Sequence, residues 1–247
     1  MQEMGKAVEE KGFCWGVFYE QFLLDKRQNL KGVQTLLAPN GICMPEELAD
    51  MLIDWVKGGG TLIAFAPAGV YDQYGKASGK LLKAAFGAVN WEHTFYNDWK
   101  ATGGKGAEAV ETMGNVRLYK GGIGKGTVWV FSSVTEYEAM KNRVLQLAEA
   151  ATQRSFYSRN GLFDLTARQE GKQRYLYVLN WDPEKTVEDD IVVRGNVERV
   201  VDEGLRRAML VPARREEGAS VFRLRLAPVE GTLLRLEMDK NGITRKK

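Results

Sequence analysis

Apolar positions in roughly the first 150 residues switch repeatedly between the spacing of strands and that of helices. Residues 61–66 form a nearly continuous apolar run, which is typical of a strand covered on both faces. Residues 45–57 predict a helix, because Pro45 suits a first helical turn and one face is apolar: Leu48, Met51, Leu52, Trp55 and Val56. With a strand at residues 33–38, these segments predict a parallel strand–helix–strand unit.

Other parts of this half carry similar signals. The aromatic segment 13–19 and the segment 127–131 predict strands, and helices are expected at residues 77–86 and 135–152. The glycine-rich stretch between them predicts short strands, with a mobile loop near residues 102–106. The first half is therefore expected to be an α/β domain covering residues 1–154.

The hydrophobic period changes to two after about residue 155. Phe222, Leu224 and Leu226, for example, alternate with Arg223 and Arg225. Six segments predict strands: 162–168, 174–180, 190–194, 197–202, 221–226 and 232–238. Short strands with turn residues between them predict an antiparallel all-β sandwich domain over residues 155–247.

Composition narrows the function classes. The chain has 247 residues, of which 44% are hydrophobic and 27% charged, as in ordinary globular proteins. Its net charge of +3 is too small to indicate nucleic-acid binding. No apolar run is long enough to span a bilayer, and residues 1–10 do not resemble a signal peptide. The sequence as given predicts a cytoplasmic protein that binds neither nucleic acid nor a membrane.

The turn after the apolar run at 61–66 lacks a nucleophile. A sharp turn that follows a buried strand often presents a catalytic Ser or Cys. Here the turn offers Ala66, Pro67 and Ala68, which carry no reactive group. The sequence therefore predicts no catalytic residue at this position.

Few other residues could supply chemistry. Cys43 precedes a predicted helix N-terminus, where a thiol can become reactive, but the sole histidine available as a base is His93. Neither Cys14 and Cys43 nor His93 has metal-ligand spacing, so we expect no metal and no cofactor. Residues 121–126 resemble a phosphate loop only in their glycines, because a strand and not a helix follows them.

Paired carboxylates and loop aromatics are the remaining candidates. The neighbouring acids, such as Asp189 and Asp190, are adjacent in sequence and are expected to point in different directions, which does not suit glycoside hydrolysis. Aromatic residues surround the loops after the strand at 61–66, where they could stack on sugars or anchor an interface. These candidate ligand or interface residues are Tyr71, Tyr74, Trp91, Tyr96 and Trp99.

Two ordered stretches resemble family 42-type β-galactosidases. Residues 36–39, 44–48 and 55–63 are similar to the amidotransferase-like middle domain of these enzymes, which is known as the trimerisation domain. Residues 174–180, 200–202 and 226–236 resemble the small β-sandwich that closes many glycosidases. The resemblance implies a class I glutamine amidotransferase-like domain with a flavodoxin-like parallel sheet, followed by the sandwich.

The resemblance also implies what this chain lacks. Such enzymes carry their two catalytic glutamates on an N-terminal (β/α)8 barrel, which takes about 250 residues and is not present here. Amidotransferases carry their cysteine on the turn that corresponds to Ala66–Ala68, so that activity does not transfer either. The resemblance thus implies a C-terminal region without the catalytic barrel.

Three hypotheses follow from the sequence. The first is a non-catalytic accessory or oligomerisation region, with self-association or a glycosidase barrel as its partner and no activity in this chain alone. The second is a carbohydrate-binding protein that uses the aromatic residues between Tyr71 and Trp99. The third is a cysteine-dependent amidotransferase-like hydrolase that uses Cys43.

Overall fold

The computed structural model of the chain describes residues 4–5, 7–8, 13, 16–39, 41–93, 98–133, 135–152, 154–170, 173–204, 209–210, 212–216 and 218–238. The chain divides into two compact units. We call residues 17–153 the α/β unit. The β unit consists of residues 154–247 together with the described residues between 2 and 16.

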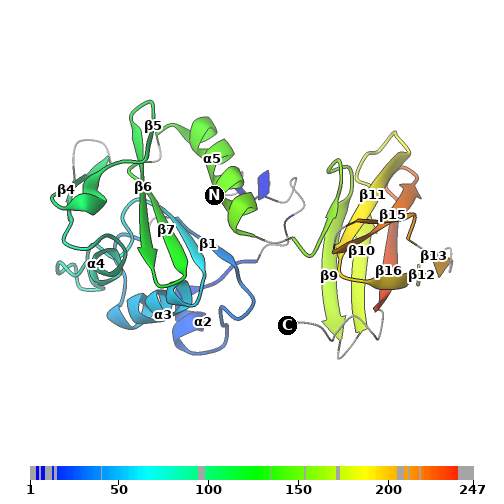
Figure 1. The fold of residues 1–247 in the computed structure, drawn as a ribbon, viewed down its shortest axis with the longest axis horizontal. Coiled ribbons are helices and arrows are strands. Elements are labelled where there is room, and N and C mark those ends of the chain that lie inside the picture. Colours follow the sequence, from blue (N-terminus) through cyan, green and yellow to red (C-terminus); the bar gives the residue numbers. More distant parts are fainter. Residues whose placement is uncertain are drawn as a thin grey trace. The chain divides into compact units, whose positions relative to one another are not determined.

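The α/β unit mixes helices with short strands (Figure 1). Its elements are α2 (Glu20–Leu24), β1 (Thr35–Pro39), α3 (Glu46–Lys57), β2 (Thr61–Phe65), α4 (Lys80–Phe86), β3 (Asn90–His93), β4 (Trp99–Thr102), the 3-10 helix η2 (Lys105–Ala107), β5 (Glu111–Met113), β6 (Val116–Ile123), β7 (Gly126–Phe131) and α5 (Tyr137–Ala151). The predicted strand–helix–strand unit is β1–α3–β2, with β1 and β2 parallel in the register Thr35 to Thr61.

The central sheet is mixed and not wholly parallel as the resemblance implied. Its strand order is β1-β2-β7-β6-β5, in which β1, β2 and β7 are parallel. β6 runs antiparallel to β7 because it returns through a tight turn at Gly124, whose φ is +59°, and β5 in turn pairs antiparallel with β6. A turn of this length can join only antiparallel neighbours. The glycines at 121–126 therefore belong to a hairpin and not to a phosphate loop.

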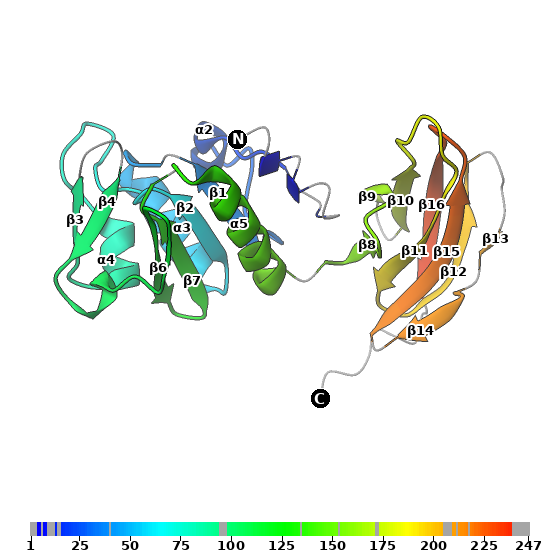
Figure 2. The ribbon, with the colours of Figure 1, turned by 90° about the horizontal axis from the view of Figure 1, so that it is seen from above.

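Helices cover both faces of this sheet (Figure 2). The apolar stripe of α3 (Leu48, Leu52 and Val56) and that of α4 pack in one cluster with Leu62 and Val128. Ile63, Phe65 and Phe131 are also buried, and alternation along their strands directs them to the other face of the sheet. Helix α5 lies on that side in Figure 2. The burial of every residue of β2 follows from this double cover.

The predicted strand at 13–19 is wrong for the residues that the structure describes. Residues 16–19 are irregular, and helix α2 begins at Glu20. The ring of Tyr19 lies 5.3 Å from that of Phe22, and the guanidinium of Arg27 lies 4.1 Å above Phe22. The aromatic residues that indicated a strand thus pack around a short helix.

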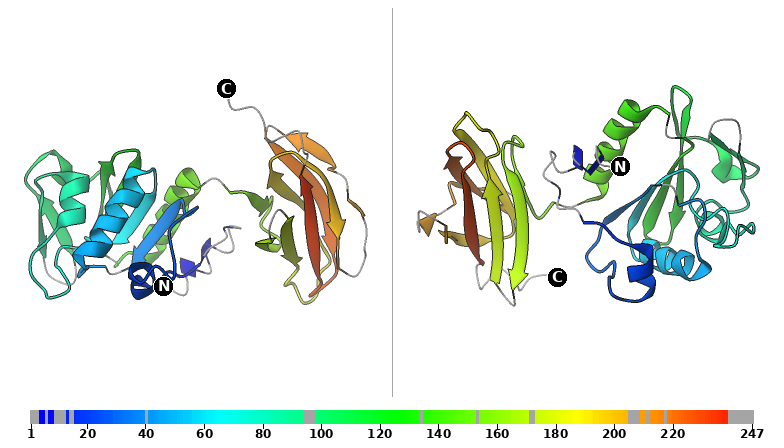
Figure 3. Two further views of the ribbon diagram at one scale, coloured as in Figure 1. Left: turned by 90° about the horizontal axis from the view of Figure 1, so that it is seen from below. Right: turned by 180° about the vertical axis from the view of Figure 1, so that it is seen from behind.

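The β unit is built from two antiparallel sheets (Figure 3). Its strands are β8 (Phe156–Ser158), β9 (Asp164–Glu170), β10 (Gln173–Leu179), β11 (Val187–Arg194), β12 (Val197–Asp202), β13 (Met209–Leu210), β14 (Arg214–Glu216), β15 (Ala219–Leu226) and β16 (Gly231–Met238). The sheet orders are β13-β12-β16-β10-β9 and β14-β15-β11-β8. One apolar cluster joins them, with Leu176 and Leu234 from the first sheet and Ile191 and Phe222 from the second.

Candidate functional site

The carboxyl ends of parallel strands β1, β2 and β7 are the natural place for a site in a sheet of this kind. At the end of β2, Ala66 has φ +94°, a conformation that residues other than glycine rarely adopt. Its N–H donates to the carbonyl of Phe131 at 2.9 Å, which continues the ladder between β2 and β7. The turn therefore keeps a strained backbone of the kind found at functional sites, but it presents a methyl group.

The loop after Ala66 is anchored to the loop after β1. Gly69, at φ +71°, donates to the carbonyl of Gly41 at 2.7 Å, and Tyr71 donates to the carbonyl of Ile42 at 3.1 Å. Met44 in turn donates to the carbonyl of Tyr71 at 2.9 Å. Ala68 is buried beneath this junction. Small apolar side chains thus fill the place where a reactive side chain would be expected.

The hydroxyl of Ser132, which follows β7, is already engaged. Ser132 is next to Ala66 in the parallel register. Its Oγ donates to Asp98 at 2.8 Å and accepts the N–H of Arg117 at 3.0 Å. The Arg117 guanidinium also contacts Asp98, at 3.2 Å. Ser132 is fully buried and its hydroxyl is held between Asp98 and the backbone of Arg117, so it joins the end of β7 to neighbouring segments.

Cys43 is an exposed free thiol in the loop between β1 and α3. Its backbone forms an isolated parallel bridge with Tyr71. His93 lies on β3, with its ring 5.0 Å from that of Trp99. Among the described residues no hydrogen bond joins Cys43 to His93, so the pair needed for a cysteine hydrolase is not assembled.

The candidate aromatic residues separate into two groups. Trp91 is half-buried, with its ring 5.4 Å from Phe86 and 5.1 Å from Tyr119. Trp99 is only 3% exposed, so the expectation that it lies on an open surface is wrong. Both side chains close one end of the core on the β3–β4 hairpin, since Trp91 pairs with Ala101 and His93 with Trp99.

The other group lies on the loop after β2. Tyr71 is half-buried and Tyr74 is 80% exposed. The Asp72 carboxylate accepts the backbone N–H groups of Tyr74 and Lys76, each at 2.8 Å, which holds Tyr74 at the tip of the loop. Tyr96 lies outside the described residues. Of the four candidates that the structure describes, Tyr71 and Tyr74 are the two that lie together on one surface loop.

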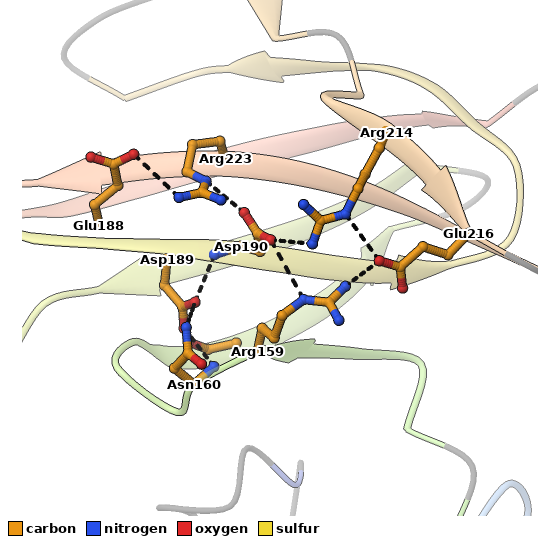
Figure 4. A network of polar contacts seen from close by, with 9 residues as sticks. Arg159, Asn160, Glu188, Asp189, Asp190, Arg214, Glu216 and Arg223 are labelled. Atoms are coloured by element: carbon orange, nitrogen blue, oxygen red, sulfur yellow. Dashed lines mark hydrogen bonds and ion pairs between the residues drawn. The ribbon is translucent and has the colours of Figure 1, made fainter.

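A network of polar contacts lies on the β unit (Figure 4). Asp190 on β11 is 4% exposed and is contacted by three arginines: Arg214 at 2.5 Å, Arg223 at 2.6 Å and Arg159 at 3.5 Å. Glu216 contacts two of the same guanidinium groups, at 2.5 Å from Arg159 and 3.0 Å from Arg214. These pairings, with Arg159 the larger cause and Arg214 the smaller, hold the pKa of Glu216 below its usual value.

Asp189 points the other way along the same strand. Its carboxylate accepts the Ser158 hydroxyl and the Asn160 backbone and side-chain N–H groups, at 2.9 and 2.7 Å for the two from Asn160. Asp189 and Asp190 are thus directed apart and are each surrounded by donors. Their partners come from β8, β14, β15 and the loop after β8, so this network joins strands and loops of the β unit.

Within the described residues, no group of three His, Cys, Asp or Glu side chains could hold a metal ion. None of the described helices is long and apolar enough to cross a membrane. Neither unit, as far as the structure describes them, contains a (β/α)8 barrel.

Comparison with known proteins shows the fold. No protein-family model matches the chain, and no curated protein matches it. A catalytic mutant of Gan42B, a GH42 β-galactosidase from G. stearothermophilus, aligns with TM-score 0.63 and 15% identity, over 95% of this chain and 35% of that chain. The β-galactosidase from Bacillus circulans sp. alkalophilus gives 0.64 and 12%, over 95% and 36%. An α-L-fucosidase isoenzyme 2 from Paenibacillus thiaminolyticus gives 0.60 and 11%, over 95% and 44%.

The chain therefore has the fold of part of the GH42 β-galactosidases, as the sequence resemblance indicated. It spans about a third of the length of those enzymes. At these identities the similarity concerns the fold and does not extend to activity.

Proposed function

We propose that this chain is a non-catalytic accessory and assembly region of a glycosidase-like protein. In this proposal the α/β unit is a class I glutamine amidotransferase-like domain with the role of a trimerisation domain, and residues 155–247 form a C-terminal β-sandwich. The partner is a second copy of the chain or a glycosidase barrel. The region corresponds to the C-terminal part of such enzymes.

The strained turn at Ala66 is the single observation that carries the proposal. It keeps a positive φ on a residue other than glycine, with an ordered ladder on one side and an anchored loop on the other. Backbone strain of this kind costs of order 1–3 kcal/mol and persists where the surroundings impose it. The side chain at this point is a buried methyl group, which supports retention of a fold without retention of its chemistry.

The alternatives have less support. A carbohydrate site built from the aromatic residues near Tyr71 would need Trp91 and Trp99 at the surface, whereas both pack against the core. A cysteine hydrolase would need a base beside Cys43, and His93 contacts Trp99 instead.

Activity measurements test the non-catalytic part of the proposal. The purified chain is assayed with aryl galactosides, aryl glucosides and glutamine, alongside a Cys43→Ala variant. We expect no turnover above background in either protein. Turnover that survives repurification and is lost in Cys43→Ala would refute the proposal and favour the cysteine hydrolase.

A further inference from the structure

The outer face of β10 carries an unusual line of apolar side chains. Leu176 and Val178 of β10 are buried on the inner side, so the residues that alternate with them face outward. β10 ends at Leu179, but the N–H of the buried Asn180 continues the ladder by donating to the carbonyl of Glu230 at 2.9 Å, and Trp181 follows it. These outward residues are Tyr175, Tyr177, Leu179 and Trp181, which we call the β10 strip. In a strand with one face exposed to water, apolar inward residues normally alternate with polar outward residues. In β10 the outward residues are apolar as well, which indicates that the outer face has a second role.

Neighbouring strands extend the β10 strip. Leu233 on β16 lies directly opposite Tyr177, and the backbone of Val229 donates to the carbonyl of Asp182, next to Trp181. The exposed fractions are 45% for Tyr177, 64% for Trp181, 58% for Val229 and 38% for Leu233. Large apolar side chains gathered at one surface in this way usually mark a binding site.

A glycine beside the β10 strip determines how Tyr177 lies. A methyl group added to Gly231 would come within 2.5 Å of the Tyr177 hydroxyl oxygen and 3.0 Å of the ring carbon that bears it. The phenol ring therefore rests on the backbone of Gly231 instead of standing away from the sheet. A ring that lies down in this way turns one face toward solvent, as stacking on a sugar ring requires.

Two arginines flank the β10 strip, one on each neighbouring strand, and they differ in their ion pairing. Arg168 on β9 and Arg235 on β16 both lie opposite Tyr175. Arg235 is paired with Glu203 at 2.5 Å and Glu237 at 2.8 Å. Arg168 is exposed and has no ion pair or hydrogen bond among the described residues. An unpaired guanidinium can bind a planar carboxylate through two parallel N–H bonds.

We propose that the β10 strip binds an oligosaccharide of uronic acids. Pyranose faces stack on Tyr177 and Trp181, a ring carboxylate pairs with Arg168, and the hydroxyl of Thr166, opposite Tyr177, lies on the same face. Tyr177 and Trp181 are four residues apart, about 13 Å along an extended strand. This separation exceeds one sugar ring, so the ligand is a chain and not a monosaccharide. The inference is independent of the assembly role proposed above.

Calorimetric titration of the full chain tests the inference. The probes are tetragalacturonate, neutral β-1,4-galactotetraose and monomeric galacturonate. We expect tetragalacturonate to bind more tightly than either other probe. Trp181→Ala and Tyr177→Ala should each weaken this binding at least about tenfold, as is usual for aromatic anchors. Arg168→Gln should reduce the affinity for tetragalacturonate to that of the neutral tetrasaccharide.

Tyr19→Ala is the matched control, because Tyr19 is similarly exposed but lies in the α/β unit. It should bind tetragalacturonate as the unaltered chain does, and urea melts should show that Trp181→Ala remains folded. Failure of tetragalacturonate to bind, equal binding of the neutral probe, or unchanged binding by Trp181→Ala would each overturn the inference. Loss of self-association in Trp181→Ala without any sugar binding would assign the strip to a protein interface and would also overturn it.

Discussion

The indole ring of Trp55 occupies the space that a side chain on Gly60 would need. A methyl group on Gly60 would come within 2.5 to 2.6 Å of three ring carbons. The Trp55 Nε1–H donates to the carbonyl of Val33 at 3.2 Å, which ties the end of α3 to the segment before β1. The glycines after α3 therefore do more than end the helix, because one of them makes room for the tryptophan that joins α3 to the sheet.

Gly60→Ala is expected to destabilise the α/β unit. The added methyl group must displace the indole ring or shift the backbone, and overpacking of this kind costs about 1–3 kcal/mol. Urea unfolding measures the loss. Gly58→Ala is the matched control: Gly58 has φ −72° and its nearest neighbour would be 3.4 Å away, so a change within about 0.5 kcal/mol is expected. Equal effects of the two substitutions would contradict this packing.

Trp55→Ala should cost about 2–3 kcal/mol. This loss of unfolding free energy lies at or below the low end of the range for large buried aromatic residues. The reason is that Trp55 is half-buried, whereas the sequence pattern had placed it on a buried helix face. Removal of the ring should also make Gly60→Ala less harmful than it is in the unaltered chain. A double-mutant cycle checks this coupling, and strictly additive losses would show that the two residues do not contact each other.

Asp190→Asn should destabilise the β unit by about 1–3 kcal/mol. The substitution removes the charge that three guanidinium groups share, although solvent screens these groups because Arg159, Arg214 and Arg223 are one-third to one-half exposed. Glu188→Gln is the control, since Glu188 is about half exposed and meets Arg223 at 3.4 Å. Thermal or urea unfolding should show a loss for Asp190→Asn that clearly exceeds the loss for Glu188→Gln, and the reverse order would contradict the network.

Acid should weaken the fold through carboxylates of the β unit. Arginines hold the pKa of Glu216 and the pKa of Glu237 below their ordinary value of 4.5, chiefly Arg159 and Arg199 respectively. A lowered carboxylate pKa gives stability that is present above the unfolded-state value and is lost as the pH falls through the folded-state value. Unfolding free energy should therefore be flat near pH 6 and decline below about pH 4.5.

Glu216→Gln isolates one part of this acid response. The variant lacks the titrating group, so its stability should decline less steeply with falling pH than that of the unaltered chain. Urea melts at a series of pH values provide the comparison. An identical acid slope in both proteins would show that the Glu216 ion pairs do not contribute.

Prediction of helices and strands from the sequence was most accurate where a long apolar pattern determines the element. β12 was predicted at 197–202, where it is found, and α3 and β2 were placed to within a residue. Short elements such as β8, β13 and β14 were missed because two or three residues carry no usable period. The antiparallel pairing of β6 with β7 was also missed. The direction of β6 depends on the hairpin that joins it to β7, and the spacing of apolar residues carries no information on strand direction.

The candidate site was predicted less well than the fold. The lack of a nucleophile in the turn at Ala66 could be recognised from residue types alone, but the positive φ of Ala66 could not. The aromatic candidates differ in exposure: Trp99 is buried and Tyr74 is exposed, although each follows a polar residue in the sequence. The β10 strip had a signal that was not used, namely apolar residues in both phases of residues 175–181.

Self-association tests the central claim of an assembly region most directly. Light scattering of the isolated chain over a wide range of concentration should show a monomer–oligomer equilibrium. A Tyr71→Ser/Tyr74→Ser variant should shift this equilibrium toward monomer, whereas Val110→Ser, which alters an exposed apolar residue away from that loop, should not. A strict monomer at every concentration, or association unchanged in the double variant, would contradict the account.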